Sequence, residues 1–254
     1  MSTSSPSRRR LPRLAAGLAA GALALLPAAV GTAGAGPSHQ RFDPPGDLVA
    51  NPHDTCMGRK VTIKAVGPPV IGTPGSDVIA GTDGPDVLYG KGGDDIICGF
   101  DGDDIIFGDD ADPADPEGGL DTINGGMGDD DIFGGPRQDF LQGSAGNDDV
   151  WGDLPGTVHG FTDTIQGGNG HDHLYGGPGA DDVWGDRKDG GFGHDVIDTT
   201  TDDPIGGDHV WAGRGNDGIL AENGTGQHVE GQAGTDICLV DEAIDTRATC
   251  ETVL

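Results

Sequence analysis

Residues 72–107 consist of four nine-residue units without a gap between them: GTPGSDVIA (72–80), GTDGPDVLY (81–89), GKGGDDIIC (90–98) and GFDGDDIIF (99–107). Each unit has glycine at positions 1 and 4, aspartate at position 6 and an aliphatic residue at position 8. A short, fixed period of this kind is typical of solenoids, in which each repeat stacks on its neighbours. The stretch therefore predicts an all-β fold of short strands and turns.

The same register continues to residue 239, and we count sixteen units in all. The units begin at Gly72, Gly81, Gly90, Gly99, Gly108, Gly125, Gly134, Gly143, Gly152, Gly167, Gly176, Gly185, Thr199, Ala212, Ala221 and Gly231. Position 8 is Ile, Leu or Val in every unit except the last, where it is Cys238. A random acidic sequence would not keep this register over so many units.

Each position of the unit has a physical role. Positions 7–9 suit a strand of about three residues in which position 8 points inward. Positions 1–6 suit a turn, where glycine supplies backbone conformations with positive φ and lets neighbouring turns approach closely. If two units complete one coil, units n and n+2 stack at the strand spacing of about 4.8 Å. Stacking would bring the position-6 carboxylates of successive coils close together.

Composition points to a cation as the partner of these carboxylates. The chain of 254 residues has 49 Gly and 43 acidic residues against 14 basic, a net charge of −29. Of the acids, 38 are Asp, which favours turns, and 5 are Glu. Nucleic acid is excluded as a partner because its binding needs a cationic surface. Calcium binds six to eight hard oxygens, and stacked turns can supply them from carboxylates and carbonyls.

The repeats resemble the RTX, or hemolysin-type, calcium-binding nonapeptide family, whose pattern is G-G-x-G-x-D-x-U-x. GGMGDDDIF (125–133) and GGPGADDVW (176–184) fit this pattern at every defined position, and the likeness covers about residues 72–239. The family implies a right-handed parallel β-roll of about eight two-strand coils, with several calcium ions in the turns. No toxin, protease or lipase segment accompanies the repeats, so no enzymatic activity carries over from the family.

Carrying the ligand role over to position 6 predicts two rows of calcium-binding aspartates. Odd-numbered units give Asp77, Asp95, Asp121, Asp139, Asp163, Asp181 and Asp208, after which Gln227 breaks the row. Even-numbered units give Asp86, Asp104, Asp130, Asp148, Asp172, Asp195, Asp217 and Asp236. Units 5, 9 and 13 are stretched near 111–118, 155–160 and 202–205, and unit 12 near 188–192. We expect these insertions to emerge mostly from the odd edge and to spoil some calcium sites there.

Position 9 predicts an aromatic ladder on the outer face of one sheet. Its members are Tyr89, Phe107, Phe133, Trp151 and Tyr175, with Trp184 and Trp211 at the equivalent position of the other sheet. Such rings either stabilise neighbouring strands or offer a platform to a sugar or protein. His171 should stack on His194 one coil away, either as solvated surface residues or as a transition-metal site.

The ends of the chain have a different character. Residues 1–35 have a cluster of arginines, an apolar stretch and a small-residue cleavage site, which indicates a signal peptide and no membrane anchor in the mature protein. Residues 36–55 are predicted to be a flexible lead-in, 56–71 an N-terminal cap strand that alternates Val61, Ile63 and Ala65 on one face, and 240–254 a C-terminal cap.

Four cysteines in an exported chain suggest disulfides. Of the three connectivities we favour Cys56 with Cys98 and Cys238 with Cys250, each pair clamping one end.

These observations predict a secreted, extracellular calcium-binding protein that is not an enzyme and whose β-roll folds when it meets calcium outside the cell. The alternative is a calcium-stabilised adhesin or carbohydrate- or protein-binding module that uses the aromatic ladder or the inserted loops to hold an extracellular glycan or protein.

Overall fold

The computed structural model describes residues 52–110, 118–157, 160–187, 191–200, 207–221, 226–240, 246–248, 250 and 252–253. By its contacts the chain divides into Met1–Asp47 and Leu48–Leu254, and every described residue belongs to the second unit. The predicted signal peptide and most of the predicted lead-in lie outside the described residues. Within the described part, no helix is long and apolar enough to cross a membrane.

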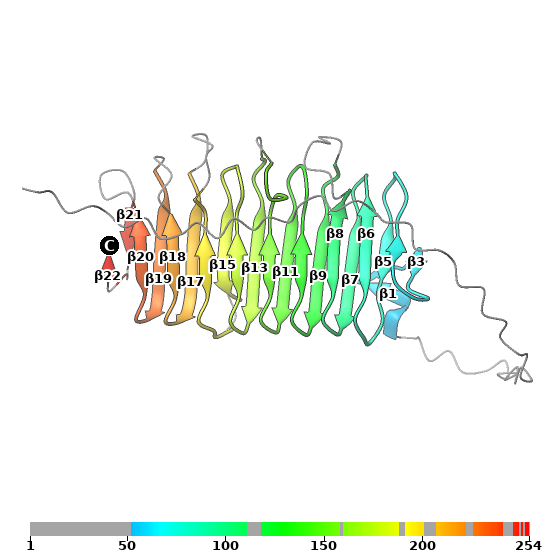
Figure 1. The fold of residues 1–254 in the computed structure, drawn as a ribbon, viewed down its shortest axis with the longest axis horizontal. Helices are drawn as coiled ribbons and strands as arrows, with labels where there is room; N and C mark the ends of the chain where they lie inside the picture. The colour runs from blue at the N-terminus through cyan, green and yellow to red at the C-terminus, as the bar shows by residue number, and fades with distance from the viewer. Residues whose placement is uncertain are drawn as a thin grey trace, which may run out of the picture. The chain divides into compact units, whose positions relative to one another are not determined.

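Two parallel sheets of ten strands each form the ladder, so the predicted parallel β-roll is confirmed (Figure 1). The odd sheet contains β3 (Ile63–Lys64), β5 (Val78–Ala80), β7 (Ile96–Asp101), β9 (Thr122–Met127), β11 (Phe140–Ala145), β13 (Thr164–Asn169), β15 (Asp182–Asp186), β17 (His209–Gly215), β19 (His228–Gly234) and β21 (Thr246–Ala248). The even sheet contains β4 (Val70–Ile71), β6 (Val87–Lys91), β8 (Ile105–Asp109), β10 (Asp131–Phe133), β12 (Asp149–Trp151), β14 (His173–Tyr175), β16 (Val196–Asp198), β18 (Gly218–Ala221), β20 (Ile237–Val240) and β22 (Thr252–Val253). Successive strands alternate between the sheets, so two units complete one coil.

The register places like positions on top of one another. Ile132 of β10 pairs with Ile106 of β8 on one side and with Val150 of β12 on the other. The sixteen residues at position 8 are all buried, and each is 0–1% exposed. They form one apolar cluster between the two sheets, with one row from each sheet. One apolar residue per unit is therefore enough to fill this thin core.

Both ends of the ladder extend further than the sequence predicted. The segment 56–71 is more than one cap strand, because it supplies β3 and β4, a first coil that pairs with β5 and β6. The predicted lead-in ends early, since Pro52–Asp54 forms a 3-10 turn (η1) and Thr55–Cys56 (β1) pairs antiparallel with Arg59–Lys60 (β2). At the other end β21 and β22 continue both sheets. The end coils lack the glycine and aspartate of the repeat, so a count of repeat units misses them.

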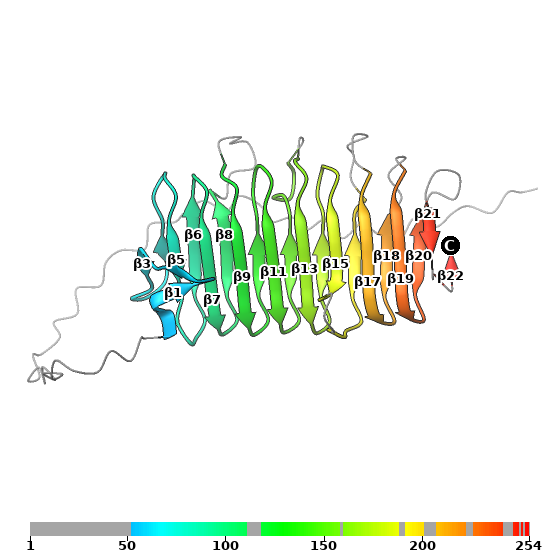
Figure 2. The same cartoon turned by 180° about the vertical axis from the view of Figure 1, so that it is seen from behind.

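Two disulfides hold the ends as predicted. Cys56 is bonded to Cys98 of β7 and Cys238 of β20 is bonded to Cys250, with Cα–Cα distances of 5.7 and 6.0 Å. Val61 is buried while Ile63 and Ala65 are half-buried, and the residues between them are exposed, so the predicted alternation is also confirmed. The view from behind shows β1 lying against the first strands of the ladder (Figure 2).

Candidate metal centre

The predicted aspartates form two files, one along each edge of the ladder. Each carboxylate belongs to the last turn residue before a strand. Asp77 is half-buried, and the other members are 0–3% exposed. The odd file is Asp77, Asp95, Asp121, Asp139, Asp163, Asp181 and Asp208, followed by a buried Gln227. The even file is Asp86, Asp104, Asp130, Asp148, Asp172, Asp195, Asp217 and Asp236.

A repeated hydrogen bond links each file. The backbone N–H of each aspartate donates to Oδ1 of the aspartate one coil further on, at 2.7–3.0 Å, through thirteen such links. The links from Asp95 to Asp121 and from Asp139 to Asp163 span the lengthened turns of units 5 and 9. The insertions therefore leave the odd file continuous.

The second carboxylate oxygen has a different environment. In eleven file members Oδ2 is buried and has no hydrogen-bond partner among the described residues. These are Asp95, Asp104, Asp121, Asp130, Asp139, Asp148, Asp163, Asp172, Asp181, Asp195 and Asp217. A buried carboxylate without a compensating charge is strongly unfavourable. Each of these oxygens is thus available to a cation.

Backbone carbonyls lie beside these oxygens. A Cβ atom placed on Gly134 would lie 2.6 Å from Oδ2 of Asp139 and 2.5 Å from the carbonyl oxygen of Gly152 in the next coil. Carboxylate and carbonyl oxygens thus converge on space that only the glycine at position 1 leaves open. Hard oxygen donors of two kinds are what calcium prefers. The residues present fit calcium.

Burial raises the pKa of twelve file carboxylates, those from Asp95 to Asp217. The pKa of Asp139 rises to about 11 because of burial first and the neighbouring carboxylates of Asp163 and Asp121 second. The pKa of Asp163 is raised well above its usual range for the same reasons, with Asp181 and Asp153 as neighbours. Burial is also the largest cause of the rise to about 7 for Asp95, Asp104 and Asp130, to about 8 for Asp121, Asp148, Asp181 and Asp195, and to about 6 for Asp172, Asp208 and Asp217. Ionised carboxylates in these files need positive charge beside them.

Three file members have hydroxyl partners. Thr73 donates to Oδ2 of Asp77 through its N–H and its hydroxyl, both at 2.8 Å. Thr82 does the same for Asp86, at 2.7 and 2.9 Å. Asp208 lies within hydrogen-bonding reach of Thr199, whose hydroxyl also donates to Oε1 of Gln227 at 2.9 Å. All three were predicted as ligands, and Oδ2 of Asp77 and of Asp86 already accepts from a threonine, so these two oxygens depend less on a cation.

No three His, Cys, Asp or Glu side chains within the described ranges form a ready-made metal cluster. The carboxylates of one file are separated by whole coils, and carbonyl oxygens lie between them. A cation bound here would therefore draw on backbone oxygens as well as on carboxylates.

Sequence reasoning missed three further buried acids. Asp109, Asp153 and Asp186 are 4%, 3% and 6% exposed and stand at position 2 of the lengthened units 5, 9 and 12. Neither carboxylate oxygen of Asp153 has a hydrogen-bond partner among the described residues. Burial raises the pKa of Asp153 to about 8. The overlooked signal is Gly-Asp at the start of each of these units.

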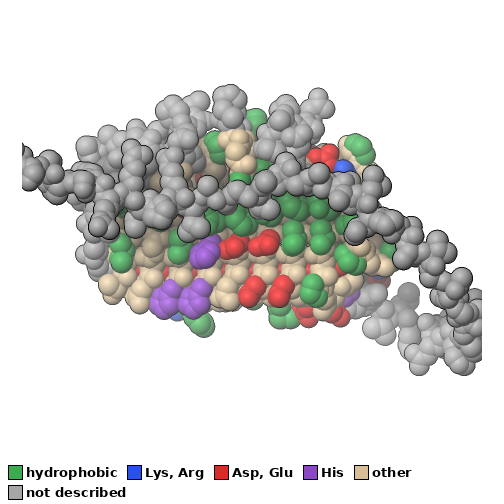
Figure 3. Space-filling model, in the orientation of Figure 1, with side chains coloured by type: hydrophobic (Ala, Val, Ile, Leu, Met, Phe, Trp, Pro, Cys, Tyr) green, Lys and Arg blue, Asp and Glu red, His purple; other side chains and the backbone are tan. Residues whose placement is uncertain are grey.

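The predicted aromatic ladder is confirmed. Its five rings stack from Tyr89 to Tyr175 with centroid distances of 5.0, 4.8, 4.5 and 5.0 Å and interplanar angles of 3–8°. Trp184 and Trp211 stack in the same way on the odd sheet, at 4.7 Å. Figure 3 shows hydrophobic side chains as a band along one face, with Asp and His side chains below it in that view. The ladder rings cover one another's faces, which favours the stabilising role.

His171 and His194 stack as predicted, with ring centroids 5.1 Å apart. Nδ1 of His171 accepts a hydrogen bond from the backbone N–H of His194 at 2.9 Å, and Nδ1 of His194 accepts one from Asn216 at 2.6 Å. An accepting Nδ1 leaves the ring proton on Nε2. The pair therefore caps backbone N–H groups of successive coils, which does not favour a transition-metal site.

Comparison with known proteins agrees with this geometry. The model of the RTX calcium-binding nonapeptide repeat matches four times, at residues 71–106, 117–136, 125–154 and 159–187. No curated protein matches the chain. The matched segments contain the file aspartates from Asp77 to Asp181, while Asp195, Asp208, Asp217 and Asp236 lie beyond the last match. Residues 71–106, 117–154 and 159–187 are therefore RTX calcium-binding nonapeptide repeats, and these repeats support a calcium-binding repeat protein.

Proposed function

We propose that this is a secreted, non-enzymatic protein whose β-roll folds when calcium fills the two aspartate files. The observation that carries the proposal is the set of eleven buried Oδ2 atoms without a hydrogen-bond partner among the described residues. Folding without a cation would bury these carboxylates either charged and uncompensated or protonated. Folding with calcium compensates them.

The charge of the chain supports the coupling of folding to the ion. A net charge of −29 repels itself in the compact state. A site that exists only in the folded chain contributes its binding free energy to folding. Many sites, each with a dissociation constant of about 10⁻⁴–10⁻³ M, as in extracellular calcium modules, would then act together.

Export is supported by the sequence of residues 1–35 and by the disulfides. Disulfides persist in oxidising compartments, and both disulfides here clamp an end of the ladder. Extracellular calcium would meet the chain there. The proposal gives the aspartates a binding role and assigns them no acid–base role.

A calcium titration followed by circular dichroism tests the proposal. We expect a disordered spectrum in chelator and a cooperative change to a β spectrum at millimolar calcium. Magnesium is the control ion, because it demands octahedral geometry and dehydrates reluctantly, so it should not replace calcium. Identical spectra in chelator and in calcium would refute calcium-dependent folding.

The alternative, an adhesin or carbohydrate-binding module, gains no specific support from the ladder. A sugar stacks on the face of an aromatic ring, and here the rings lie 4.5–5.0 Å apart, face to face. A glycan array with the calcium-loaded protein would test that alternative directly.

A further inference from the structure

The lengthened turns of units 5, 9 and 12 share an aspartate that the regular turns lack. At position 2 of most regular units the backbone is left-handed, with φ of 124° at Gly126, 88° at Ser144 and 129° at Gly168; Thr73 and Thr82 of units 1 and 2 are exceptions. The lengthened turns have Asp109, Asp153 and Asp186 at this position instead. All three side chains are buried: Asp109 and Asp186 end strands β8 and β15, and Asp153 follows β12 in a bend.

Asp153 gives the clearest view of this position. Its side chain is 3% exposed, and both carboxylate oxygens lack a hydrogen-bond partner among the described residues. Asp153 lies close enough to Asp163 and Asp181 to interact with their charges. These two residues are the file members of its own unit and of the next coil, and their Oδ2 atoms are unpartnered as well.

Carbonyl oxygens of the next coil lie beside both carboxylates. A Cβ atom on Gly160 would lie close to Oδ2 of Asp153 and to the carbonyl oxygen of Pro178. A Cβ atom on Gly152 would lie 2.5 Å from Oδ2 of Asp163 and close to the carbonyl oxygen of Gly176. The lengthened turn thus has a second buried carboxylate beside a carbonyl oxygen of the next coil, where a regular turn has one.

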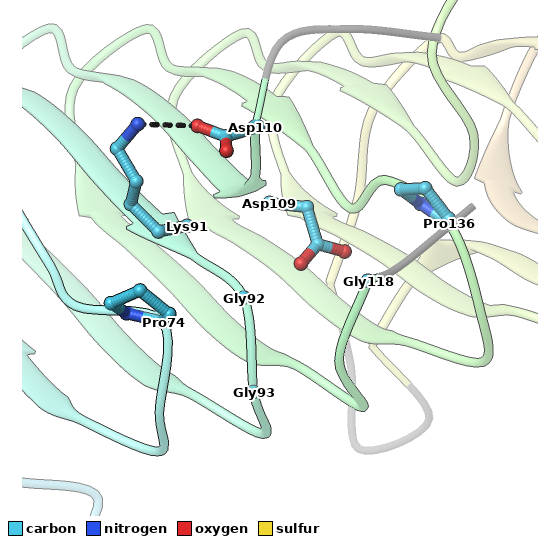
Figure 4. A pocket seen from close by; sticks show the side chains of 8 residues that line it. All are labelled: Pro74, Lys91, Gly92, Gly93, Asp109, Asp110, Gly118 and Pro136. Atoms are coloured by element: carbon cyan, nitrogen blue, oxygen red, sulfur yellow. Dashed lines mark hydrogen bonds and ion pairs between the residues drawn. The ribbon is translucent and has the colours of Figure 1, made fainter. Parts of the chain in front are cut away.

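Unit 5 has the same arrangement beside a hollow of about 220 Å³ lined by Gly93, Asp109, Gly118 and Pro136 (Figure 4). The carboxylate of Asp109 points between the turn of Gly93 and the turn of Gly118 (Figure 4). Lys91 points away from it, and its amine lies 2.5 Å from Asp110. The backbone N–H of Gly119 donates to Oδ1 of Asp109 at 3.0 Å.

Unit 12 repeats the arrangement on the opposite edge. Asp186 is 6% exposed and its Oδ1 has no hydrogen-bond partner among the described residues, while Oδ2 accepts from the backbone N–H of Arg214 at 2.5 Å. The negative charge of Asp186 contributes to the raised pKa of three even-file members, Asp172, Asp195 and Asp217.

We propose that Asp153 is an additional calcium ligand that shares an ion with Asp163, and that Asp109 and Asp186 serve the same role in units 5 and 12. This inference rests on the proposed function. In each of these lengthened turns the second carboxylate would add a charged ligand to the carbonyl oxygens and the file carboxylate. Calcium affinity rises with the number of charged ligands. The insertions would then strengthen the calcium sites that we expected them to spoil.

The test compares Asp153→Asn with Asp149→Asn in the full chain, using calcium alone as the ligand. Both changes remove one negative charge, but Asp149 lies on the outer face, where it is paired with His173 at 2.9 Å. We expect Asp153→Asn to raise the calcium midpoint of folding about tenfold and to lower the number of bound ions by one. Asp149→Asn should leave both unchanged or lower the midpoint slightly.

A structural role predicts the opposite sign. Since no described group donates to either oxygen of Asp153, Asn would only relieve a buried charge and would lower the midpoint. The inference is overturned if the calcium midpoint of Asp153→Asn lies at or below that of Asp149→Asn. The proposed function is decided separately, by whether the unaltered chain folds with calcium in the same titration.

If Asp153→Asn does not fold at saturating calcium, Asp186→Asn takes its place, with Asp182→Asn as control. Asp182 is half-buried and lies 2.9 Å from His209 on the outer face. Oδ2 of Asp186 accepts a hydrogen bond from Arg214 whose loss alone would raise the midpoint, so the number of bound ions is the readout here. A loss of one ion relative to Asp182→Asn supports the inference, and an unchanged number overturns it.

Discussion

The backbone N–H of Asp121 donates a 2.8 Å hydrogen bond to Oδ1 of Asp139, one coil further along the chain. The bond occupies one oxygen of the carboxylate and fixes its orientation, so that Oδ2 remains buried without a partner among the described residues. The same link runs along both files. Four predictions concern these unpartnered oxygens and the contacts that stabilise the ladder.

The first prediction separates two aspartates of one file. Asp86 and Asp104 lie one coil apart, but Thr82 donates to Oδ2 of Asp86 while Oδ2 of Asp104 has no described partner. Asp104→Asn should lower the number of bound calcium ions by one, and Asp86→Asn should have a smaller effect. Calorimetric titration with calcium measures both. Equal losses would mean that the threonine does not substitute for the ion.

The second prediction concerns the glycine at position 1. Gly134→Ala would place a Cβ 2.5–2.6 Å from the carbonyl oxygen of Gly152 and Oδ2 of Asp139. In the presence of calcium we expect the free energy of unfolding to fall by about 1–3 kcal/mol, which is typical of overpacking. We also expect weaker calcium binding. Urea unfolding at saturating calcium gives the free energy. Gly84→Ala is the control, since nothing lies within 4 Å of its Cβ, and it should be neutral or slightly stabilising.

The third prediction tests the aromatic ladder as a stabilising element. Phe133 stacks on Phe107 at 4.8 Å and on Trp151 at 4.5 Å. Phe133→Leu keeps an apolar side chain but removes both stacks. Since each ring pair contributes about 0.5–1.5 kcal/mol, we expect the free energy of unfolding to fall by about 1–3 kcal/mol.

Phe140→Leu is the matched change, because Phe140 is half-buried on the odd sheet, outside the ladder. Urea unfolding in calcium should rank Phe133→Leu as the more damaging of the two. Equal stabilities would contradict a stabilising role for stacking.

The fourth prediction is a dependence on pH in chelator. Burial raises the pKa of Asp104 to about 7 and that of Asp121 to about 8. A carboxylate with a raised pKa binds more protons in the folded state, so it stabilises that state fully below its unfolded pKa of about 3.9, and this contribution is lost as the pH rises through 7 to 8. Without calcium, lowering the pH from 8 to 5 should therefore increase the folded fraction, followed by circular dichroism.

Calcium should reverse this dependence. Its ligands must be deprotonated, so the calcium midpoint should move to higher concentration as the pH falls. A folded fraction in chelator that is constant between pH 8 and 5 would contradict the protonation of the files.

The sequence by itself determined the repeat, its inward residue and its edges. Ile132 faces inward and Asp130 lies at the edge because a strand alternates its sides and a turn precedes it. The pairing of Cys56 with Cys98 followed from their places beside the start of the ladder. The resemblance to RTX repeats named the cation.

Only the tertiary structure decided which oxygens need that cation. The partner of a file carboxylate lies in another coil, 18 residues away for Asp121 and Asp139 and 26 for Asp104 and Asp130. Whether Oδ2 meets a threonine, a carbonyl or a second carboxylate such as Asp153 depends on how those coils stack. Hydrogen bonding and burial are properties of the stacked neighbours, so the nine-residue pattern alone cannot specify them.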